Sequence, residues 1–280
     1  MAEAQTILIT GCSSGIGYVC AHGLKERGWT VVASCRKAAD VERLRGEGLD
    51  CVLIDYEDEP SIRSGFEEAM QITNGQLDAV FNNGAYATPG FTEDLPTDAL
   101  RAIFETNFFG WHTLTTLALK EMRKAGRGRI VQCSSILGFA AMPGRGAYNS
   151  TKFALEGLND TLRLELRGSG IHVSLIQPGP ITTKIRQNAI AHFDRWMRPT
   201  IAGSYWKDEY ERKVIPRLNG PYRKSRGELG TEAVLEKLIH AIESPRPRAK
   251  YPVTWPTHLA GYLKRVLPQR AYDWMLNRLG

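Results

Sequence analysis

The sequence predicts an α/β fold in which a doubly wound parallel sheet of about seven strands is flanked by helices. Two observations lead to this fold class. Short runs rich in β-branched residues alternate with longer segments of helical periodicity, and the alternation repeats six times. These runs are apolar throughout rather than alternately apolar and polar, which is typical of strands covered by helices on both faces.

Six strands are expected in the first two thirds of the chain, at residues 6–10, 30–34, 51–55, 78–83, 128–135 and 172–177. Helical patterns lie between them, including residues 15–27, 60–73, 98–123 and 148–167. Gly28 and Gly168 directly follow two of these patterns, as glycine often does at the end of a helix.

The regular alternation ends after the sixth run. Residues 184–230 are polar and aromatic and too long for a simple connection, so we expect a lid over the substrate there. The rest of the chain predicts a helix at 231–243, a short strand-like run at 250–255 and an amphipathic tail at 271–279. We interpret residues 1–280 as a single domain with a core at about 6–183.

Composition places the chain among ordinary soluble globular proteins, with 42% hydrophobic and 24% charged residues in 280. No basic start followed by an apolar run occurs, so we expect a cytoplasmic protein without a signal peptide or spanning helix. The net charge of +6 arises in residues 186–280, which hold 18 basic and 9 acidic side chains. Without a basic and aromatic groove pattern, this favours a solvated surface over nucleic-acid binding.

The basic, apolar tail has two interpretations. It could lie on a membrane surface, but Pro268 interrupts it, so packing against the lid or a partner subunit is favoured.

The cysteines favour neither a disulfide nor a metal site, because they are odd in number and form no Cys-x-x-Cys pair. We expect these thiols to be small core residues: Cys12, Cys20, Cys35, Cys51 and Cys133.

A glycine-rich segment, TGCSSGIG, joins the first expected strand to the first helix. Gly11, Gly15 and Gly17 would let the backbone approach a pyrophosphate closely. The amides and the dipole at the start of the helix favour the negative charge of that group. Because a strand precedes the segment and a helix follows it, the segment predicts a dinucleotide site.

Tyr148 and Lys152 lie four residues apart in YNSTK, which places them on one face of a helix. A free tyrosine loses its proton only near pH ~10, so a neighbouring cation is needed to make it reactive at neutral pH. Taken alone, the pair is more simply interpreted as a solvated surface pair.

Further motifs change that interpretation. TGCSSGIG, NNGA at 82–85, Asn107, Ser135 thirteen residues before Tyr148, YNSTK, and PG at 178–179 follow one another in order. Together they resemble the short-chain dehydrogenase/reductase family over residues 6–183, which implies a Rossmann-type fold. The family usually has Asn-Asn-Ala-Gly where this chain has NNGA. Because the exchange moves the residue that tolerates positive φ, we expect a local adjustment without loss of cofactor binding.

The resemblance implies four catalytic residues. Tyr148 would protonate the substrate oxygen during reduction or take its proton during oxidation. Lys152 would lower the pKa of Tyr148 and hold the nicotinamide ribose. Ser135 would hydrogen-bond the substrate oxygen, and Asn107, in a locally distorted helix, would hold a water that links Lys152 to solvent.

The side chains after the second strand indicate which dinucleotide binds. An acid there would accept from the ribose 2′-hydroxyl, whereas this chain has Arg36 and Lys37, which suit a 2′-phosphate. The sequence therefore predicts NADP(H). The expected cofactor residues are Gly11, Ser13, Ser14, Gly15, Ile16, Gly17, Arg36, Lys37, Asp55, Asn83, Gly84, Tyr148, Lys152, Pro178, Gly179, Ile181 and Thr183.

The substrate is expected to be a small apolar carbonyl or alcohol, held by Ser135 and Tyr148 and covered by Phe193, Trp196 and Met197. These lid residues could equally pack the lid against a neighbouring subunit. The layout resembles the 17β-hydroxysteroid and retinol dehydrogenase-like branch, which implies a steroid, a retinoid or a long-chain carbonyl. We expect a homodimer or homotetramer.

The motifs leave three candidate functions. The first is an NADP(H)-dependent oxidoreductase that interconverts apolar aldehydes or ketones and alcohols. The second is a non-catalytic NADP(H)-binding regulator, which would be expected to lack one of the four catalytic residues. The third is a dehydratase or epimerase, which would have a different glycine spacing and a longer chain.

Overall fold

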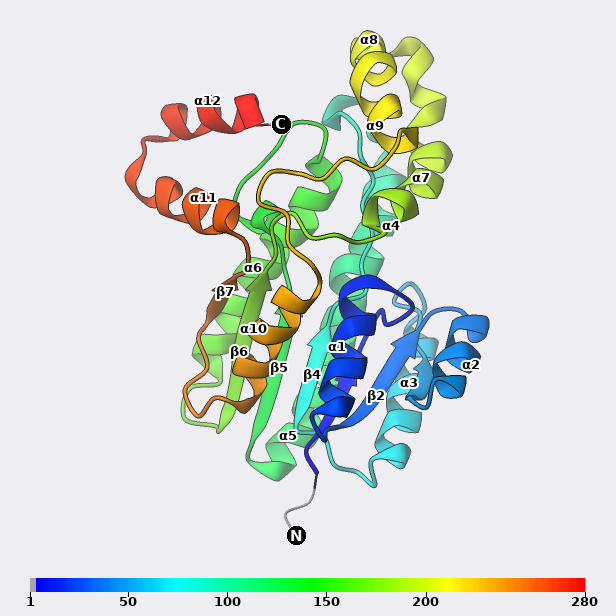
Figure 1. Ribbon diagram of the computed structural model, residues 1–280, viewed down its shortest axis with the longest axis vertical. Helices are drawn as coiled ribbons and strands as arrows, with labels where there is room; N and C mark the ends of the chain where they lie inside the picture. Colours follow the sequence, from blue (N-terminus) through cyan, green and yellow to red (C-terminus); the bar gives the residue numbers. More distant parts are fainter. Residues whose placement is uncertain (1–3, 280) are drawn as a thin grey trace.

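The computed structural model describes residues 4–279 and contains one parallel sheet with the strand order β3-β2-β1-β4-β5-β6-β7 (Figure 1). This confirms the predicted fold class. The strands are β1 (Thr6–Ile9), β2 (Thr30–Cys35), β3 (Asp50–Leu53), β4 (Ala79–Asn82), β5 (Gly128–Cys133), β6 (Ile171–Gln177) and β7 (Lys250–Pro252).

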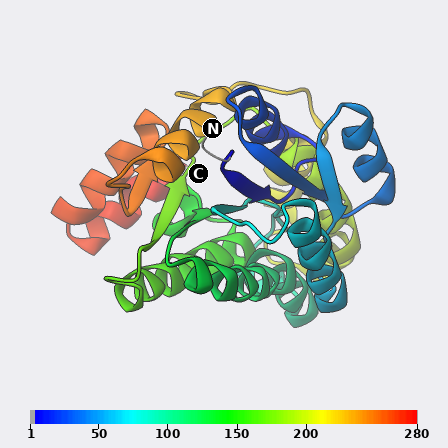
Figure 2. The same cartoon turned by 90° about the horizontal axis from the view of Figure 1, so that it is seen from below.

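Helices cover both faces of the sheet (Figure 2). One face carries α1 and α10, which pack on each other, and the opposite face carries α3, α5 and α6. The helices are α1 (Gly15–Glu26), α2 (Ala38–Gly46), α3 (Glu59–Ile72), α4 (Thr97–Phe104), α5 (Gly110–Ala125), α6 (Gly146–Glu165), α7 (Ile185–Trp196), α8 (Lys207–Glu209), α9 (Ile215–Asn219), α10 (Glu232–Glu243), α11 (Trp255–Val266) and α12 (Gln269–Leu279).

The central strands are hydrophobic along their whole length because helices cover both of their faces. Every residue of β1 and of β4 is buried. The same core holds the five cysteines, which are buried free thiols, as expected. Burial of this much apolar surface is the main source of the stability of such a sheet.

The helix expected at residues 98–123 is divided into three parts. Between α4 and α5, residues Glu105–Phe109 form a π-helical turn. Helices α2 and α11 were not among those expected. Helix α2 is short and buries only Val41 and Leu44 among its apolar side chains, so its amphipathic pattern is weak. Helix α11 buries Thr257 and Ala260 and exposes large apolar side chains such as Trp255 and Tyr262.

The lid and the C-terminal helices lie on opposite sides of the carboxyl edge of the sheet (Figure 1). The lid comprises α7, α8 and α9, and it packs around Phe193, Met197 and Tyr210. Helices α11 and α12 instead pack on the loop after β5, where Tyr272 and Leu276 meet Ala140. The tail thus packs on this loop and not on the lid, while the expected packing against a partner subunit stays a prediction.

No helix within residues 4–279 is both long enough and apolar enough to cross a bilayer. The same part of the chain contains no group of three or more His, Cys, Asp or Glu side chains that could hold a metal ion.

A buried polar cluster joins the ends of β1 and β4 beneath the glycine-rich segment. The Tyr56 hydroxyl donates to Asn82 Oδ1 (2.6 Å) and lies within hydrogen-bond distance of the Thr10 hydroxyl (2.9 Å). Asn82 Nδ2 donates to Thr115 Oγ1 (3.1 Å) on α5. A buried polar group that loses its partner costs more than the bond contributes, so this cluster is sensitive to any deletion.

We expect Tyr56→Phe to lower the free energy of unfolding by about 1–2 kcal/mol, because Asn82 Oδ1 loses its donor in a buried position. Urea denaturation measures the change. Tyr205→Phe is the matched control, since Tyr205 is 85% exposed and should leave the stability unchanged. Equal stabilities of the Tyr56→Phe variant and the wild type would contradict a structural role for the cluster.

Candidate active site

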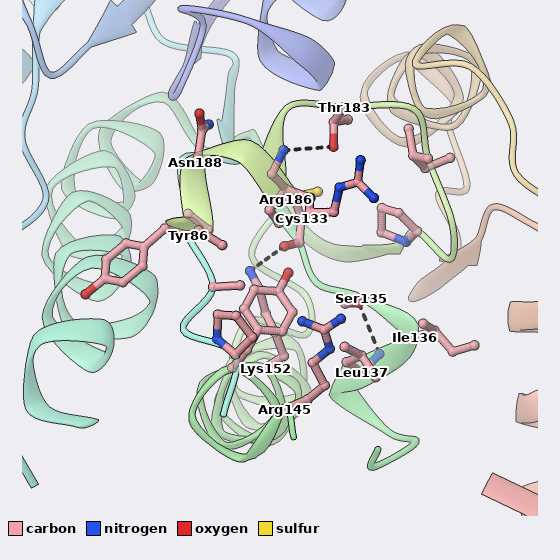
Figure 3. Close-up of a pocket in the computed structure, with 18 of the residues that line it drawn as sticks. Tyr86, Cys133, Ser135, Ile136, Leu137, Arg145, Lys152, Thr183, Arg186 and Asn188 are labelled. Carbon is pink, nitrogen blue, oxygen red and sulfur yellow. Dashed lines mark hydrogen bonds between the residues drawn. The ribbon is translucent and has the colours of Figure 1, made fainter. Parts of the chain in front are cut away.

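A cleft of about 1030 Å³ lies at the carboxyl edge of the sheet. It begins where β1 and β4 are neighbours, the point at which the strand order reverses direction. Helices leave the sheet toward opposite faces there, which opens a crevice for ligands in doubly wound folds. The wall of the cleft runs from the glycine-rich segment, past Ser135 and Lys152, to the lid and the C-terminal helices (Figure 3).

The glycine-rich segment forms a tight cradle that fits a dinucleotide pyrophosphate. Gly11 and Gly15 have φ values of 69° and 65°, which side chains rarely allow. A Cβ atom on Gly17 would lie 2.5 Å from Gly11 O, so the loop needs glycine there as well. No backbone hydrogen bond within residues 4–279 engages the amides of Ser13 and Ser14, which precede α1 and are free to bind an anion.

The order Gly84-Ala85 in NNGA, the reverse of the family's Ala-Gly, fits the fold because Gly84 is needed for close packing against Gly11. A Cβ on Gly11 would lie 2.5 Å from Gly84 Cα, and Gly84 is not among the glycines with positive φ. Asn83 N donates to Thr10 Oγ1 (2.9 Å) and Asn83 Nδ2 to Thr10 O (3.1 Å), which fixes the two loops together. The expected conformational adjustment is therefore small.

Basic residues line the cleft after β2. Arg36 and Lys37 are exposed at its rim and form no ion pair with any residue in the described range. Asp55, after β3, lines the same end. Sequence reasoning missed Arg43, whose guanidinium donates to Ser13 O (2.8 Å) and so supports the glycine-rich segment. The sequence did not indicate this contact, because Arg43 lies in α2 and that helix was not expected.

All but one of the expected cofactor residues line the cleft. The exception is Gly17, which lies behind Gly11 and acts through packing. The residues that line it are Gly11, Ser13, Ser14, Gly15, Ile16, Arg36, Lys37, Asp55, Asn83, Gly84, Tyr148, Lys152, Pro178, Gly179, Ile181 and Thr183.

Tyr148, Ser135 and Lys152 converge on the cleft from two elements. Tyr148 and Lys152 lie one turn apart on α6, and Ser135 follows β5. Lys152 Nζ donates to Cys133 O (2.8 Å) and lies 4.1 Å from the Trp111 ring centroid and 5.6 Å from that of Tyr148 (Figure 3). Sequence reasoning missed Trp111, although it lies four residues after Asn107.

Burial is the largest influence on the pKa values of Tyr148 and Lys152. It raises the pKa of Tyr148 above the ordinary range, against the lowering effects of Ser135 and Arg145. Burial also lowers the pKa of Lys152 to about 8, while Cys133 and Glu156 act to raise it. Desolvation of the phenolate is thus the largest influence on the Tyr148 pKa in the polypeptide itself, and the expected lowering by Lys152, assisted by the oxidised nicotinamide, stays a prediction.

Asn107 does not line the cleft. It lies in the π-helical turn, so the helix is locally distorted there, and its side chain is wholly buried. Asn107 Nδ2 donates to Tyr86 O (2.9 Å), and Tyr86 N donates to Asn107 Oδ1 (3.1 Å). Both polar ends of the side chain are therefore engaged in holding the segment after β4.

The lid residues expected at the substrate lie elsewhere. Phe193 and Met197 are fully buried in the lid interior, and the Trp196 ring is 4.4 Å from the Arg195 guanidinium; none of the three lines the cleft. They pack in the lid interior, where Ala189 of α7 joins Phe193 one helical turn away. The α7 residues at the cleft are Ile185, Arg186, Asn188, Ala189 and His192.

The end of the cleft beyond Tyr148 has apolar walls from three parts of the chain. Leu137 follows β5, Leu218 belongs to α9, and Leu263 and Leu276 come from the C-terminal helices. Sequence reasoning missed the C-terminal contribution, because only the folded chain brings α11 and α12 to this edge of the sheet.

Comparison with known proteins agrees with this geometry. A family model described as short chain dehydrogenase matches residues 5–193. The uncharacterized oxidoreductase YbbO of Escherichia coli K12 is 40% identical over 272 residues, which cover 97% of this chain and 94% of YbbO. Human retinol dehydrogenase 8 is 33% identical over 261 residues, covering 88% of this chain and 80% of the human protein. The chain belongs to the short-chain dehydrogenase family and is an oxidoreductase of that family.

The fold matches a solved structure over nearly its whole length. A short chain dehydrogenase from Burkholderia cenocepacia J2315, in complex with NADP, superimposes with a TM-score of 0.75 and 19% identity, covering 98% of both chains. At this identity the similarity concerns the fold. The family model and the 40% identity with YbbO confirm the family resemblance expected from the six motifs.

The buried charge of Lys152 should make stability depend on pH. Its folded-state pKa of about 8 lies below the ordinary 10.5, so the charged form destabilises the fold fully below pH 8. That cost disappears as the pH rises toward 10.5. Relative to Lys152→Met, the free energy of unfolding of the wild type should rise by about 2–3 kcal/mol between pH 7 and pH 10.

Urea denaturation of the cofactor-free protein at several pH values measures this difference. Lys120→Met is the matched control, because Lys120 is exposed on α5 and should give a difference that does not change with pH. A pH-independent difference for Lys152→Met would argue against a buried charge at this position.

Proposed function

We propose that the protein is an NADP(H)-dependent oxidoreductase that interconverts apolar aldehydes or ketones and the corresponding alcohols. One observation carries the proposal: a single cleft joins a cradle for pyrophosphate, two free basic side chains after β2, and Tyr148 with Ser135 and Lys152. The apolar walls beyond Tyr148 support an apolar substrate.

The preference for NADP(H) rests on charge. Arg36 and Lys37 occupy the place where an acidic side chain would accept from a ribose 2′-hydroxyl and repel a 2′-phosphate. The guanidinium of Arg36 can bind a phosphate with two parallel hydrogen bonds. A structural relative that binds NADP, the Burkholderia cenocepacia dehydrogenase, is consistent with this preference.

The chain's own residues handle the substrate oxygen. When bound, the nicotinamide supplies a hydride to the carbonyl carbon in reduction, or accepts one from the alcohol in oxidation. The Tyr148 hydroxyl gives its proton to the oxygen in reduction, and Ser135 Oγ donates a hydrogen bond to the same oxygen. Because burial raises the pKa of Tyr148, the phenol keeps its proton at neutral pH, which favours its use as the acid.

Lys152 and Asn107 position the reacting groups. The Lys152 ammonium, held by Cys133 O and the Trp111 ring, stabilises the phenolate that forms after proton transfer. The family resemblance implies that Lys152 would also hold the nicotinamide ribose. Asn107 fixes the backbone at Tyr86, beside the cleft. The human relative retinol dehydrogenase 8 supports an apolar alcohol or carbonyl as substrate.

The subunit arrangement is also a proposal. The π-helical turn before α5 and helix α6 expose Phe109, Phe153 and Leu164 on the surface of the chain. Since exposed large apolar side chains favour burial in an interface, we propose a homodimer or homotetramer.

Tyr148→Phe should abolish turnover, by about 10²–10⁴-fold, because the substrate oxygen loses its proton donor. Loss of NADPH absorbance with a panel of apolar aldehydes, ketones, steroids and retinoids measures turnover, and NADPH fluorescence measures binding, which should be retained. Tyr205→Phe in the exposed part of the lid is the control. Full activity of Tyr148→Phe would refute the assignment, and a wild type that binds NADPH without oxidising it would favour the regulator.

Arg36→Ala should reduce kcat/KM with NADPH by roughly 10- to 100-fold and leave kcat/KM with NADH almost unchanged, because only NADPH carries the phosphate. Arg63→Ala serves as the control, since Arg63 pairs with Glu59 on the outer surface of α3. A wild type that uses NADH as well as NADPH would contradict the charge argument.

A further inference from the structure

The cleft carries more positive charge than an apolar carbonyl requires. Besides Lys152, six basic side chains line it from the start of α6, the lid and the segment after the lid: Arg145, Lys184, Arg186, Lys213, Arg217 and Arg226. Glu209 is the one acidic residue among the lining residues after Asp55 in the described chain. It is already paired with Lys213 (2.7 Å) and Arg212 (3.1 Å). Most of the positive charge of the cleft is therefore not neutralised by the protein.

Arg145 is the basic residue closest in sequence to Tyr148, and its backbone is firmly held. It pairs with Gly90 in an isolated β-bridge, and its carbonyl accepts from Asn149 N (2.8 Å) at the start of α6. Its half-buried guanidinium points into the pocket (Figure 3). No hydrogen bond or ion pair engages this guanidinium within residues 4–279.

Arg217 approaches the same space from the lid. It belongs to α9 and lines the cleft beside Leu218. Burial is the largest cause that lowers the pKa of Arg145 to about 10, and the positive charge of Arg217 contributes to the same lowering. Both side chains line the one cleft, Arg145 half-buried and Arg217 exposed at its rim. Two cationic groups that share a cleft repel each other, and an anion bound between them removes that repulsion.

The cofactor does not account for these two residues. The cradle that fits the pyrophosphate belongs to β1 and α1, and the basic pair suited to a 2′-phosphate follows β2. Arg145 instead precedes Tyr148 by one helical turn and lines the pocket with Ser135. Its free guanidinium therefore faces the substrate.

We propose that Arg145 and Arg217 form a subsite for an anionic oxygen group of the substrate, so that the substrate is an apolar carbonyl compound bearing a carboxylate or a phosphate. This inference rests on the proposed function. A planar guanidinium binds either group through two parallel, charge-assisted hydrogen bonds. Because Arg145 belongs to the core and Arg217 to the lid, one anion bound by both also draws the lid onto the substrate.

Matched pairs of substrates test the subsite. Each pair has the same chain and differs by the charged group: succinic semialdehyde against butanal, azelaic semialdehyde against nonanal, and glycolaldehyde phosphate against glycolaldehyde. The first two pairs test a carboxylate at two chain lengths, and the third tests a phosphate. The wild type should prefer the anionic member of at least one pair by roughly tenfold or more in kcat/KM, the value of one charge-assisted hydrogen bond.

Variants assign the preference to the two residues. In Arg145→Gln, and in the double variant with Arg217→Gln, the ratio of the two kcat/KM values should fall toward one, mainly through KM for the anionic substrate. Arg145→Lys should restore part of the ratio, because it keeps the charge and loses the planar fork. Arg101→Gln is the control, since Arg101 pairs with Asp98 on an exposed face of α4. Because Arg145 has no partner to lose, the variants should keep the melting temperature of the wild type.

Binding without turnover separates this inference from the proposed function. Calorimetry with the NADPH-loaded wild type should show nonanoate binding more tightly than nonanol, and the double variant should lose that difference. If no carbonyl is turned over, the proposed function fails while the calorimetry still decides on the subsite. Equal binding of nonanoate and nonanol by the wild type, with no preference in any pair, would overturn the subsite. A substitution of Arg145 that shifts the pH profiles of both members of a pair equally, and leaves the ratio of their kcat/KM values unchanged, would also overturn the subsite. Arg145 would then act through Tyr148.

Discussion

The buried ammonium of Lys152 is the interaction on which the site depends. It donates to Cys133 O at the end of β5 and lies against the Trp111 ring, whose indole N–H donates to Gly84 O (2.8 Å). Gly84 in turn packs directly on Gly11. One continuous series of contacts thus joins the groups at the substrate oxygen to the glycine-rich segment. Because a buried charge is tolerated only where its partners are fixed, each link must keep its geometry.

The rest of the molecule divides into a rigid frame and a variable enclosure. The carboxyl edge of the sheet holds the polar groups at positions set by strand pairing, as is usual in doubly wound folds. The lid and the C-terminal helices supply the opposite walls from segments with their own small cores. The chemistry can therefore stay constant while these two segments determine which molecule enters.

Sequence patterns predicted the frame well because its requirements are local. Strands covered on both faces need continuous apolar runs, and a tight approach such as that of Gly11 to Gly84 needs glycine. Sequence patterns did not predict contacts between segments that are far apart along the chain. Phe193 and Met197 suggested a substrate wall, yet their helix turns them into the lid interior. Helix α11 packs on the loop after β5, which lies far from it along the chain, so no local pattern indicated where the helix docks.

The sequence by itself determined the fold class, the family, and the order of Ser135, Tyr148 and Lys152 along the chain, because these depend on local periodicity and short spacings. Only the tertiary structure decided which lid residues face the cleft, that α11 and α12 wall it, and that burial raises the pKa of Tyr148. It also decided that Arg145 and Arg217 share one space. Those outcomes depend on desolvation and on contacts between distant segments, which no local pattern records.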